Sequence, residues 1–302
     1  MREYTARMSD EHAPHTAAPV PEDGPAAIDL LLTADERYLE HALTLLVSVR
    51  VNNPHARLRA FLLHAGIEQA RLQRAVSALA GIHCELVCTR VEPELFRDAK
   101  VTGRYPPEMY FRLIAPHVLP RSCSRVLYLD PDTLVINPLA PLVGIDLHGK
   151  LFAAAAHTAP TEIPHEVNKV RLNTEHRYFN TGVLLMDVAA LRERESPDEI
   201  AAFIAAHADR FILPDQDAFN MLYGDCTLEV PDAVWNLDAR RMVVHRVASK
   251  GEVDMDWVVE NTAIVHFCGK DKPWDESYPF RLGVLYKHYQ QLAGRMLGQA
   301  HV

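Results

Sequence analysis

The chain has 302 residues, of which 48% are hydrophobic and 24% are charged, and its formal net charge is −9. This composition is typical of a soluble globular protein, and the acidic balance, without a basic run of five or more residues, argues against nucleic acid as a partner. No apolar stretch approaches the roughly 20 residues that span a bilayer, which argues against a transmembrane protein.

The N-terminal segment and the cysteines give two further expectations. Residues 1–26 are rich in alanine, proline, histidine and acidic residues, and they lack the apolar centre of a signal peptide. We expect a disordered leader here, followed by one domain over residues 27–302. The cysteines are odd in number and lack CxxC spacing, which predicts free thiols in a reducing cytoplasm. They are Cys84, Cys88, Cys123, Cys226 and Cys268.

The first half of the ordered chain alternates between strand and helix patterns. The apolar run at 28–33 predicts a buried strand, and the following pattern predicts a helix over 38–51, a strand over 58–64, a helix over 68–80 and a strand over 82–88. Two successive strand–helix–strand steps predict a parallel sheet that is covered by helices.

The middle of the chain is less regular. A helix is expected over 107–119, and strands are expected over 126–129, 134–136 and 151–156. Residues 157–177 lose periodicity, and a stretch of that length without a pattern is either functional or disordered. We therefore expect these residues to form a lid that orders over a bound ligand.

The last third returns to regular patterns in places. We expect a strand over 178–188, helices over 197–208 and 215–223, a strand over 263–266 and a C-terminal helix over 281–297.

The stretch "YLDPDTLVINPL", residues 128–139, carries two aspartates directly after an apolar strand. Asp130 and Asp132 are two residues apart, so an extended backbone points both side chains to the same side. Two carboxylates held together call for a cation, although an Asp-Pro-Asp turn is the alternative reading of the same residues.

Ligands of an open α/β sheet sit beyond the carboxyl ends of its strands. Asp35 follows the first predicted strand, and His266 ends the last one. Two carboxylates and one imidazole leave coordination positions open for a diphosphate held through a divalent cation. The histidine nitrogen favours manganese over magnesium.

Four motifs together suggest a family. "LYLDPDTLV", "YFNTGVLLMDV", "PDQDAFN" and "HFCGKDKPW", in that order, resemble the glycosyltransferases of family 8. These are retaining, nucleotide-sugar-dependent enzymes that include bacterial lipooligosaccharide galactosyltransferases and glycogenin. The resemblance runs from about residue 28 to 286. It implies an α/β architecture of the GT-A type, a Rossmann-like mixed sheet flanked by helices in one catalytic domain.

The resemblance also implies a metal and phosphate site. Asp130, Asp132 and His266 match the residues that bind Mn²⁺, with Mg²⁺ as the alternative, and hold the donor diphosphate through it. Gly269 and Lys272 match the positions that clasp the phosphates. A glycine allows close backbone approach, and a lysine adds a positive charge beside the leaving group.

The resemblance assigns the nucleotide to the first loop. "TADERYLEH" matches the uridine-binding loop, with Ala34, Asp35 and Tyr38 at the base and ribose and with Arg37 in place of a family asparagine. Arg112, in "MYFRLIAP", matches an arginine near the donor sugar and phosphate.

The donor sugar is expected to lie against two further motifs. "YFNTG" places Asn180 and Thr181 against the sugar, and in "PDQD" Gln216 and Asp217 are expected to face it, while Asp215 is also suited to capping the following helix. The residues expected to act in the reaction are Asn180, Gln216, Asp217 and Lys272.

The resulting hypothesis is a manganese-dependent, retaining transferase that moves glucose or galactose from UDP-glucose or UDP-galactose to a saccharide or lipid-linked acceptor. No glutamate occupies an obvious nucleophile position, which favours attack from the front face. The chain ends "QQLAGRMLGQAHV", with a single arginine, so no strong membrane anchor is expected. The alternatives are a non-catalytic, metal-dependent sugar-binding protein and a glycoside hydrolase with paired carboxylates.

Overall fold

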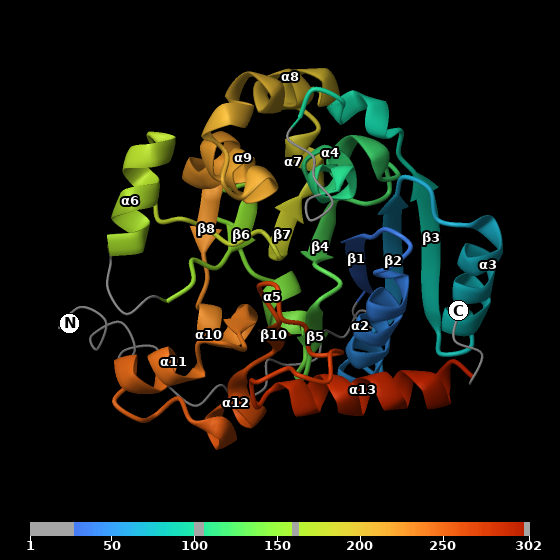
Figure 1. The fold of residues 1–302 in the computed structure, drawn as a ribbon. Coiled ribbons are helices and arrows are strands. Elements are labelled where there is room, and N and C mark those ends of the chain that lie inside the picture. Colours follow the sequence, from blue (N-terminus) through green and yellow to red (C-terminus); the bar gives the residue numbers. More distant parts are fainter. Residues whose placement is uncertain (1–26, 100–105, 159–162, 299–302) are drawn as a thin grey trace.

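The computed structural model describes residues 27–99, 106–158 and 163–298. The leader predicted over residues 1–26 lies outside them. Within the described residues, a seven-stranded sheet has the order β3-β2-β1-β4-β7-β6-β8, and a three-stranded sheet has the order β5-β10-β9 (Figure 1). The strands are β1 (Ala27–Thr33), β2 (Arg57–His64), β3 (Cys84–Arg90), β4 (Arg125–Leu129), β5 (Thr133–Val135), β6 (Phe152–Ala154), β7 (Val183–Asp187), β8 (Thr227–Glu229), β9 (Leu237–Asp238) and β10 (Ile264–His266).

Helices surround both sheets. The α-helices are α2 (Leu39–Asn52), α3 (Gln69–Ala80), α4 (Phe111–Val118), α5 (Ala140–Val143), α6 (Ile163–Leu172), α7 (Val188–Leu191), α8 (Pro197–His207), α9 (Pro214–Tyr223), α10 (Asp232–Trp235), α11 (Met242–Ala248), α12 (Met255–Asn261) and α13 (Gly283–Met296). The 3₁₀ helices are η1 (Pro93–Phe96), η2 (Pro107–Tyr110), η3 (Ala208–Arg210) and η4 (Gly224–Cys226).

The predicted parallel half of the sheet is confirmed. β1 pairs in parallel with β2 on one side and with β4 on the other, and β2 pairs in parallel with β3. β3 begins at Cys84 rather than at residue 82, because His83 closes the turn after α3 with a positive φ of 56°. Beyond β4 the direction changes, since β7 runs antiparallel to both β4 and β6. The sheet is therefore mixed, and the described residues form one α/β domain.

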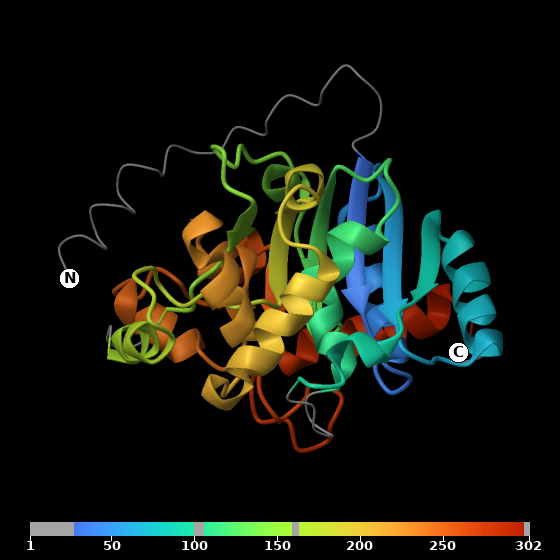
Figure 2. The same ribbon diagram turned by 90° about the horizontal axis from the view of Figure 1, so that it is seen from above.

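Strand residues alternate between two hydrophobic cores, one on each face of the sheet. Leu30 and Leu32 pack with α2 and α3, whereas Leu31 packs with α4, α8 and α9. Figures 1 and 2 show the same layering, with α4 and α8 on one side and α13 passing on the other. This period of two is what an extended backbone produces when both faces are covered.

Three sequence expectations need correction. Residues 157–177 are not without structure, because α6 occupies Ile163–Leu172. The strand expected over 178–188 begins only at Val183, and the helix expected over 107–119 begins with the 3₁₀ helix η2. The short elements from β8 to α12 have no counterpart in the sequence expectations.

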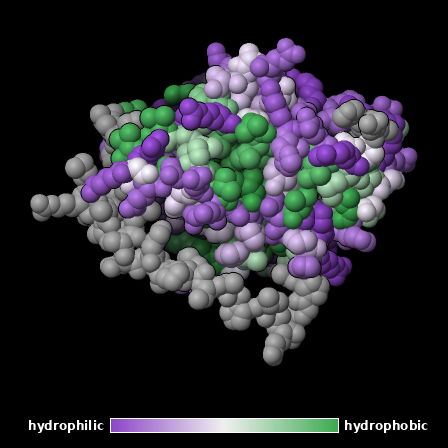
Figure 3. All heavy atoms as spheres, turned by 90° about the horizontal axis from the view of Figure 1, so that it is seen from below, coloured by the Kyte–Doolittle hydropathy of each residue, from purple (hydrophilic) through white to green (hydrophobic). Residues whose placement is uncertain are grey.

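Apolar side chains also reach the surface. Figure 3 shows patches of them on the underside of the molecule, where α11, α12 and α13 lie in Figure 1. These helices carry the exposed residues Val243, Val247, Val259 and Val284. Exposed apolar side chains are ordinary on a protein surface and indicate no partner by themselves. Among the described residues, no helix is long and apolar enough to cross a bilayer.

Candidate active site

One cleft of about 780 Å³ opens at the carboxyl ends of β1, β4 and β10, beside the start of α9. The sequence-predicted residues that line it are Ala34, Asp35, Tyr38, Arg112, Asp130, Asp132, Asn180, Thr181, Asp215, Gln216, His266, Gly269 and Lys272. Asp217 is the predicted site residue that the structure does not bring into this cleft. Residues far apart in the sequence thus share one cavity at the edge where an α/β sheet binds ligands.

A potential metal site lies at the centre of the cleft. Candidate ligand atoms of Asp130, Asp132 and His266 all lie within 4.8 Å of one another. His266 Nε2 is 3.3 Å from Asp132 Oδ1 and 3.9 Å from Asp130 Oδ2. The histidine reaches the aspartates because β10 pairs antiparallel with β5, with His266 opposite Thr133. Two carboxylates and one imidazole nitrogen suit a divalent cation of the manganese or magnesium class.

Basic groups balance the charge of Asp132. Lys272 Nζ pairs with Asp132 Oδ2 and also donates to the carbonyl oxygen of Phe267, at 3.1 Å. Burial opposes ionisation of Asp132, but Lys272 and His266 outweigh it and hold its pKa below the usual range. Burial would lower the pKa of His266, yet Cys268 and Asp132 raise it well above its ordinary value. This side of the cleft is a cluster of mutually compensating charges.

Arg112 is a buried cation in the inner wall of the cleft, not a surface residue of α4. Its side chain is 6% exposed. Nη2 lies 2.9 Å from Asp130 Oδ1, and Nη1 lies 3.4 Å from Asp215 Oδ2. Nη1 also donates to the carbonyl oxygen of Thr181 at 2.8 Å. Tyr128 supports the same carboxylate, because its hydroxyl donates to Asp130 Oδ1 at 2.5 Å. Arg112 therefore fixes Asp130 from the inner wall of the cleft.

Three uncharged polar side chains and one carboxylate, Asp215, line the opposite side of the cleft. Asn180 Nδ2 donates to Gln216 Oε1 at 3.0 Å, and Thr181 Oγ1 donates to Asp215 Oδ2 at 3.2 Å. The capping role suggested for Asp215 is wrong, because Leu213 is the N-cap of α9 and offers no side-chain cap. Burial raises the pKa of Asp215, and Arg112 opposes that shift.

Asp217 was expected to face the donor sugar, but it does not line the cleft. Asp217 is fully buried. Its carboxylate accepts two hydrogen bonds of 2.7 Å from Arg171 of α6 and one of 2.5 Å from the hydroxyl of Tyr178. The backbone N–H groups of Ile212 and Leu213 also donate to it. Asp217 therefore joins α6 to the start of α9 and supports the cleft without facing it.

The first loop turns tightly around Asp35. This carboxylate accepts from the backbone N–H groups of Arg37 and Tyr38, at 2.9 and 3.1 Å, and from Arg37 Nε at 2.8 Å. The ring of Tyr38 meets Trp274 edge-on, with 5.8 Å between ring centroids, and Trp274 stacks on His41. Arg37, which differs from the family asparagine, thus binds the acid that was expected to contact the nucleotide.

Sequence reasoning missed Asn236, which is fully buried. Its Oδ1 lies 2.9 Å from His266 Nδ1, and its Nδ2 donates to Asn180 Oδ1 at 2.9 Å. Asn236 stands between α10 and β9, in the region for which the sequence offered no elements. His157, Cys268, Arg240 and Arg241 also line the cleft without having been predicted. The pairing of β9 with β10 helps to bring the segment that contains Asn236 to the site.

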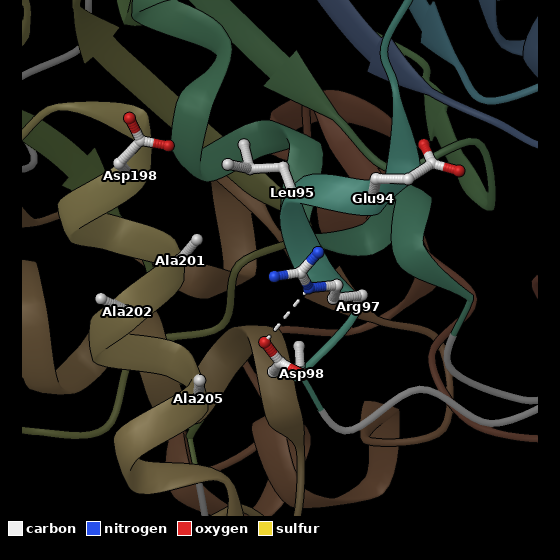
Figure 4. A pocket seen from close by; sticks show the side chains of 9 residues that line it. Glu94, Leu95, Arg97, Asp98, Asp198, Ala201, Ala202 and Ala205 are labelled. Carbon is white, nitrogen blue, oxygen red and sulfur yellow. Dashed lines mark hydrogen bonds and ion pairs between the residues drawn. The ribbon is translucent and has the colours of Figure 1, made fainter.

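A second depression of about 290 Å³ lies between η1 and α8 (Figure 4). Leu95, Arg97 and Asp98 border it on one side, and Ala201 and Ala205 of α8 border it on the other. Arg97 pairs with the neighbouring Asp98 at 3.5 Å, and both side chains are exposed. A surface pair of this kind contributes little binding energy, so the chemistry-bearing cluster lies in the larger cleft.

Comparisons with known proteins identify the family. The family model described as "Glycosyl transferase family 8" matches residues 29–277. General stress protein A of Bacillus subtilis is 26% identical over 256 residues, which cover 82% of this chain and 88% of that protein. The lipopolysaccharide 1,2-glucosyltransferase of Escherichia coli K12 is 23% identical over 247 residues, which cover 80% and 70% of the two chains.

Solved structures show the same fold. A crystal structure of the galactosyltransferase LgtC with donor and acceptor sugar analogues has a TM-score of 0.74 at 23% identity, covering 88% of this chain and 96% of that one. The glycosyltransferase GlyE of Streptococcus pneumoniae TIGR4 has a TM-score of 0.67 at 20% identity, covering 91% and 63%. With the family match over most of its length, the chain belongs to glycosyltransferase family 8, and it is a glycosyltransferase of the GT-A fold.

Proposed function

We propose that this enzyme transfers a hexose, glucose or galactose, from a UDP-sugar to a hydroxyl acceptor with retention of configuration and with Mn²⁺ as its cofactor. The observation that carries the proposal is the cluster of Asp130, Asp132 and His266, whose candidate ligand atoms lie within 4.8 Å of one another. Lys272 stands in the same cluster. A diphosphate brings negative charge to such a site, and a cation with a lysine is what neutralises it.

The residues fit a divalent cation of this class. Asp130, Asp132 and His266 would hold it, and when bound it supplies charge neutralisation for the departing diphosphate. The imidazole nitrogen favours Mn²⁺ over Mg²⁺, because Mg²⁺ prefers oxygen ligands. Arg112 keeps the Asp130 carboxylate in place through its 2.9 Å ion pair, so the first ligand of the site is oriented before a donor arrives.

The protein's own side chains would bind and orient the donor. Gly269 has a φ of +97°, a conformation that favours glycine, and the Arg240 side chain occupies the space that a Cβ atom would take. Its backbone would approach the phosphates beside Lys272. Asn180, Thr181 and Gln216 line the cleft and would contact the sugar hydroxyls. Ala34 and Tyr38 line the end where the uridine would lie.

The proposed reaction is an attack on the same face from which UDP departs. The acceptor oxygen forms a bond to the anomeric carbon, and the bond from that carbon to the β-phosphate oxygen breaks. UDP leaves with the bonding electron pair, and its β-phosphate oxygen takes the acceptor proton. A double displacement would need a free carboxylate at the anomeric carbon. Asp215 is paired with Arg112 and Thr181, and Asp217 does not line the cleft, so neither carboxylate is free to act as the nucleophile. Gln216 is an amide and a poor nucleophile.

Two observations support an acceptor class and a compartment. The similarity to the Escherichia coli lipopolysaccharide 1,2-glucosyltransferase supports a saccharide acceptor, as in lipopolysaccharide or other polysaccharide synthesis, or a lipid-linked one. All five cysteines are free, which supports the reducing cytoplasm as the compartment.

The test is a panel of nucleotide sugars with and without Mn²⁺, in which UDP release and the mass of acceptor products are measured. Manganese-dependent UDP release from UDP-glucose or UDP-galactose, together with a hexose added to the acceptor, is the expected result. Binding of sugar with no turnover of any donor would point to a sugar-binding protein. Metal-independent cleavage of a glycoside would point to a hydrolase.

A further inference from the structure

A chain of side-chain amides runs behind the cleft from His266 to Gln216. His266 Nδ1 contacts Asn236 Oδ1 at 2.9 Å, and Asn236 Nδ2 contacts Asn180 Oδ1 at 2.9 Å. Asn180 Nδ2 then contacts Gln216 Oε1 at 3.0 Å. Asn236 is fully buried and does not line the cleft, so its amide acts on other side chains of the enzyme and not on a ligand.

A backbone group fixes the direction of this chain. The N–H of Gly182 lies 3.0 Å from the Asn180 side chain. An N–H can only donate, so the atom of Asn180 that faces it must be the carbonyl oxygen. Asn236 contacts the same oxygen and must present its amide NH₂ group there. Its own carbonyl oxygen is then the atom that faces His266.

The direction of the chain decides which nitrogen of His266 carries the proton. A carbonyl oxygen can only accept, so Nδ1 of His266 must donate to Asn236. In the neutral ring the lone pair is then on Nε2, the nitrogen that lies 3.3 Å from Asp132 and 3.9 Å from Asp130. Metal-bound histidines are ordinarily held in this way, by an acceptor at the other ring nitrogen.

The backbone around the chain is built to fit it. β9 pairs in parallel with β10, with Asp238 opposite His266, so Asn236 reaches the imidazole from the neighbouring strand. A Cβ atom at Gly182 would collide with the His266 ring. The carbonyl oxygen of Gly182 also accepts from the N–H of Asp130 at 2.8 Å. Gly182 therefore lies against two of the three metal-ligand candidates, Asp130 and His266, and sets the orientation of Asn180.

We propose that Asn236 is a positioning residue that holds His266 in the Nδ1-protonated form and aims Nε2 toward Asp130 and Asp132, with which it would hold the cation. The inference rests on the proposed metal-dependent function. Because the same amide also holds Asn180, Asn236 couples the metal site to the side chains expected at the donor sugar. Loss of a partner of this kind ordinarily lowers metal affinity by about 10- to 100-fold.

Two substitutions separate this role from packing. Asn236→Leu keeps the size of the side chain but removes both hydrogen bonds. Asn236→Asp keeps an acceptor for His266 Nδ1 and removes the donor to Asn180. We expect Mn²⁺ affinity, measured by electron paramagnetic resonance without any nucleotide, to fall at least tenfold in Asn236→Leu. In Asn236→Asp it should stay within threefold of the wild type or rise.

Asn53→Leu is the matched control. Asn53 is a buried asparagine that donates to the carbonyl oxygen of Val49 and accepts from the N–H of Leu139, both at 2.9 Å, and it does not line the cleft. We expect its loss to lower the melting temperature and to leave Mn²⁺ affinity unchanged. The three variants are compared after thermal melts have shown that each is folded at the assay temperature.

The outcomes separate the positioning role from the function on which it rests. Equal Mn²⁺ affinity in the wild type and Asn236→Leu would overturn the positioning role while leaving the metal site in place. Equal weakening by Asn236→Leu and Asn236→Asp would also overturn it, since one variant retains the acceptor. Absence of Mn²⁺ binding by the wild type would overturn both the positioning role and the proposed metal dependence.

Discussion

The two walls of the cleft are built from different chemistry. The strand wall, Asp130, Asp132, His266 and Lys272, consists of charges that compensate one another. The helix wall, Asn180, Thr181, Asp215 and Gln216, has one carboxylate, Asp215, which pairs with Arg112, and three uncharged side chains that are held by hydrogen bonds. The difference indicates a division of labour, because a charged wall suits a metal and a diphosphate, and a largely uncharged polar wall suits sugar hydroxyls.

Two buried side chains connect these walls. Arg112 pairs with Asp130 on the strand wall and with Asp215 on the helix wall. Asn236 binds His266 on one side and Asn180 on the other. We therefore expect a change in one wall to alter the position of side chains in the other. Substitutions within a wall and substitutions of Arg112 or Asn236 should then affect binding and stability differently.

Removing one charge from the strand wall should have the largest effect. Asp132→Asn should weaken manganese-dependent UDP binding by roughly 1,000-fold, since a metal contributes several kcal/mol of charge stabilisation. Calorimetric titration of UDP in the presence of Mn²⁺ measures the change. The variant should remain folded at the assay temperature, but its melting temperature should fall, because Lys272 and His266 lose a buried charge partner.

The control for that substitution is Asp146→Asn. The Asp146 side chain is 77% exposed and pairs only weakly with His148. It should bind UDP as the wild type does. Wild-type UDP affinity in Asp132→Asn would remove this aspartate from the proposed metal site.

Breaking the connection at Arg112 should affect both stability and binding. Arg112→Lys keeps the charge but cannot contact Asp130, Asp215 and the carbonyl oxygen of Thr181 together. Disrupting a buried ion pair typically costs about 3 kcal/mol of unfolding free energy. Urea unfolding should show that loss, and UDP titration should show weaker binding in the same variant. Normal binding with lowered stability would limit Arg112 to a structural role.

Substitution of Asp217 tests whether the residues behind the helix wall affect stability without affecting donor binding. Asp217→Asn weakens the pair with Arg171 and leaves one of several donors facing an amide NH₂ group. We expect a loss of about 2 kcal/mol in unfolding free energy. The KM for the donor should change less than threefold at a temperature where the variant is folded. A large rise in KM without loss of stability would return Asp217 to the sugar.

The parts of this site that sequence reasoning found are those with a local signal. The first strands and helices show periodicity, and the pair Asp130 and Asp132 follows an apolar strand, so their placement could be predicted. α6 was missed because its helical pattern is weak and its second residue is Pro164. Its contact with α9, through Arg171 and Asp217, depends on the folded structure and leaves no local signal. Asn236 was missed because its role depends on the pairing of β9 with β10, which no local pattern specifies.

The last prediction concerns Gln216, on the surface of the helix wall. Its Oε1 accepts from Asn180, and its side chain lines the cleft. If the amide only orients the sugar and stabilises the charge that develops on it, Gln216→Ala removes a dipole but no group that forms a covalent bond. The kcat should then fall about tenfold, corresponding to about 1.4 kcal/mol of transition-state stabilisation, while unfolding free energy stays unchanged.

Gln216→Glu is the companion variant, because it offers a carboxylate at the same position. Intact-protein mass spectrometry with donor and without acceptor should show no added hexose on the wild type, since front-face attack forms no glycosyl-enzyme. A hexose adduct on the wild type would replace that route with a double displacement. An adduct confined to Gln216→Glu would instead show that this position faces the anomeric carbon while the natural amide does not attack it. That result would place the anomeric carbon against the helix wall and the leaving diphosphate against the strand wall.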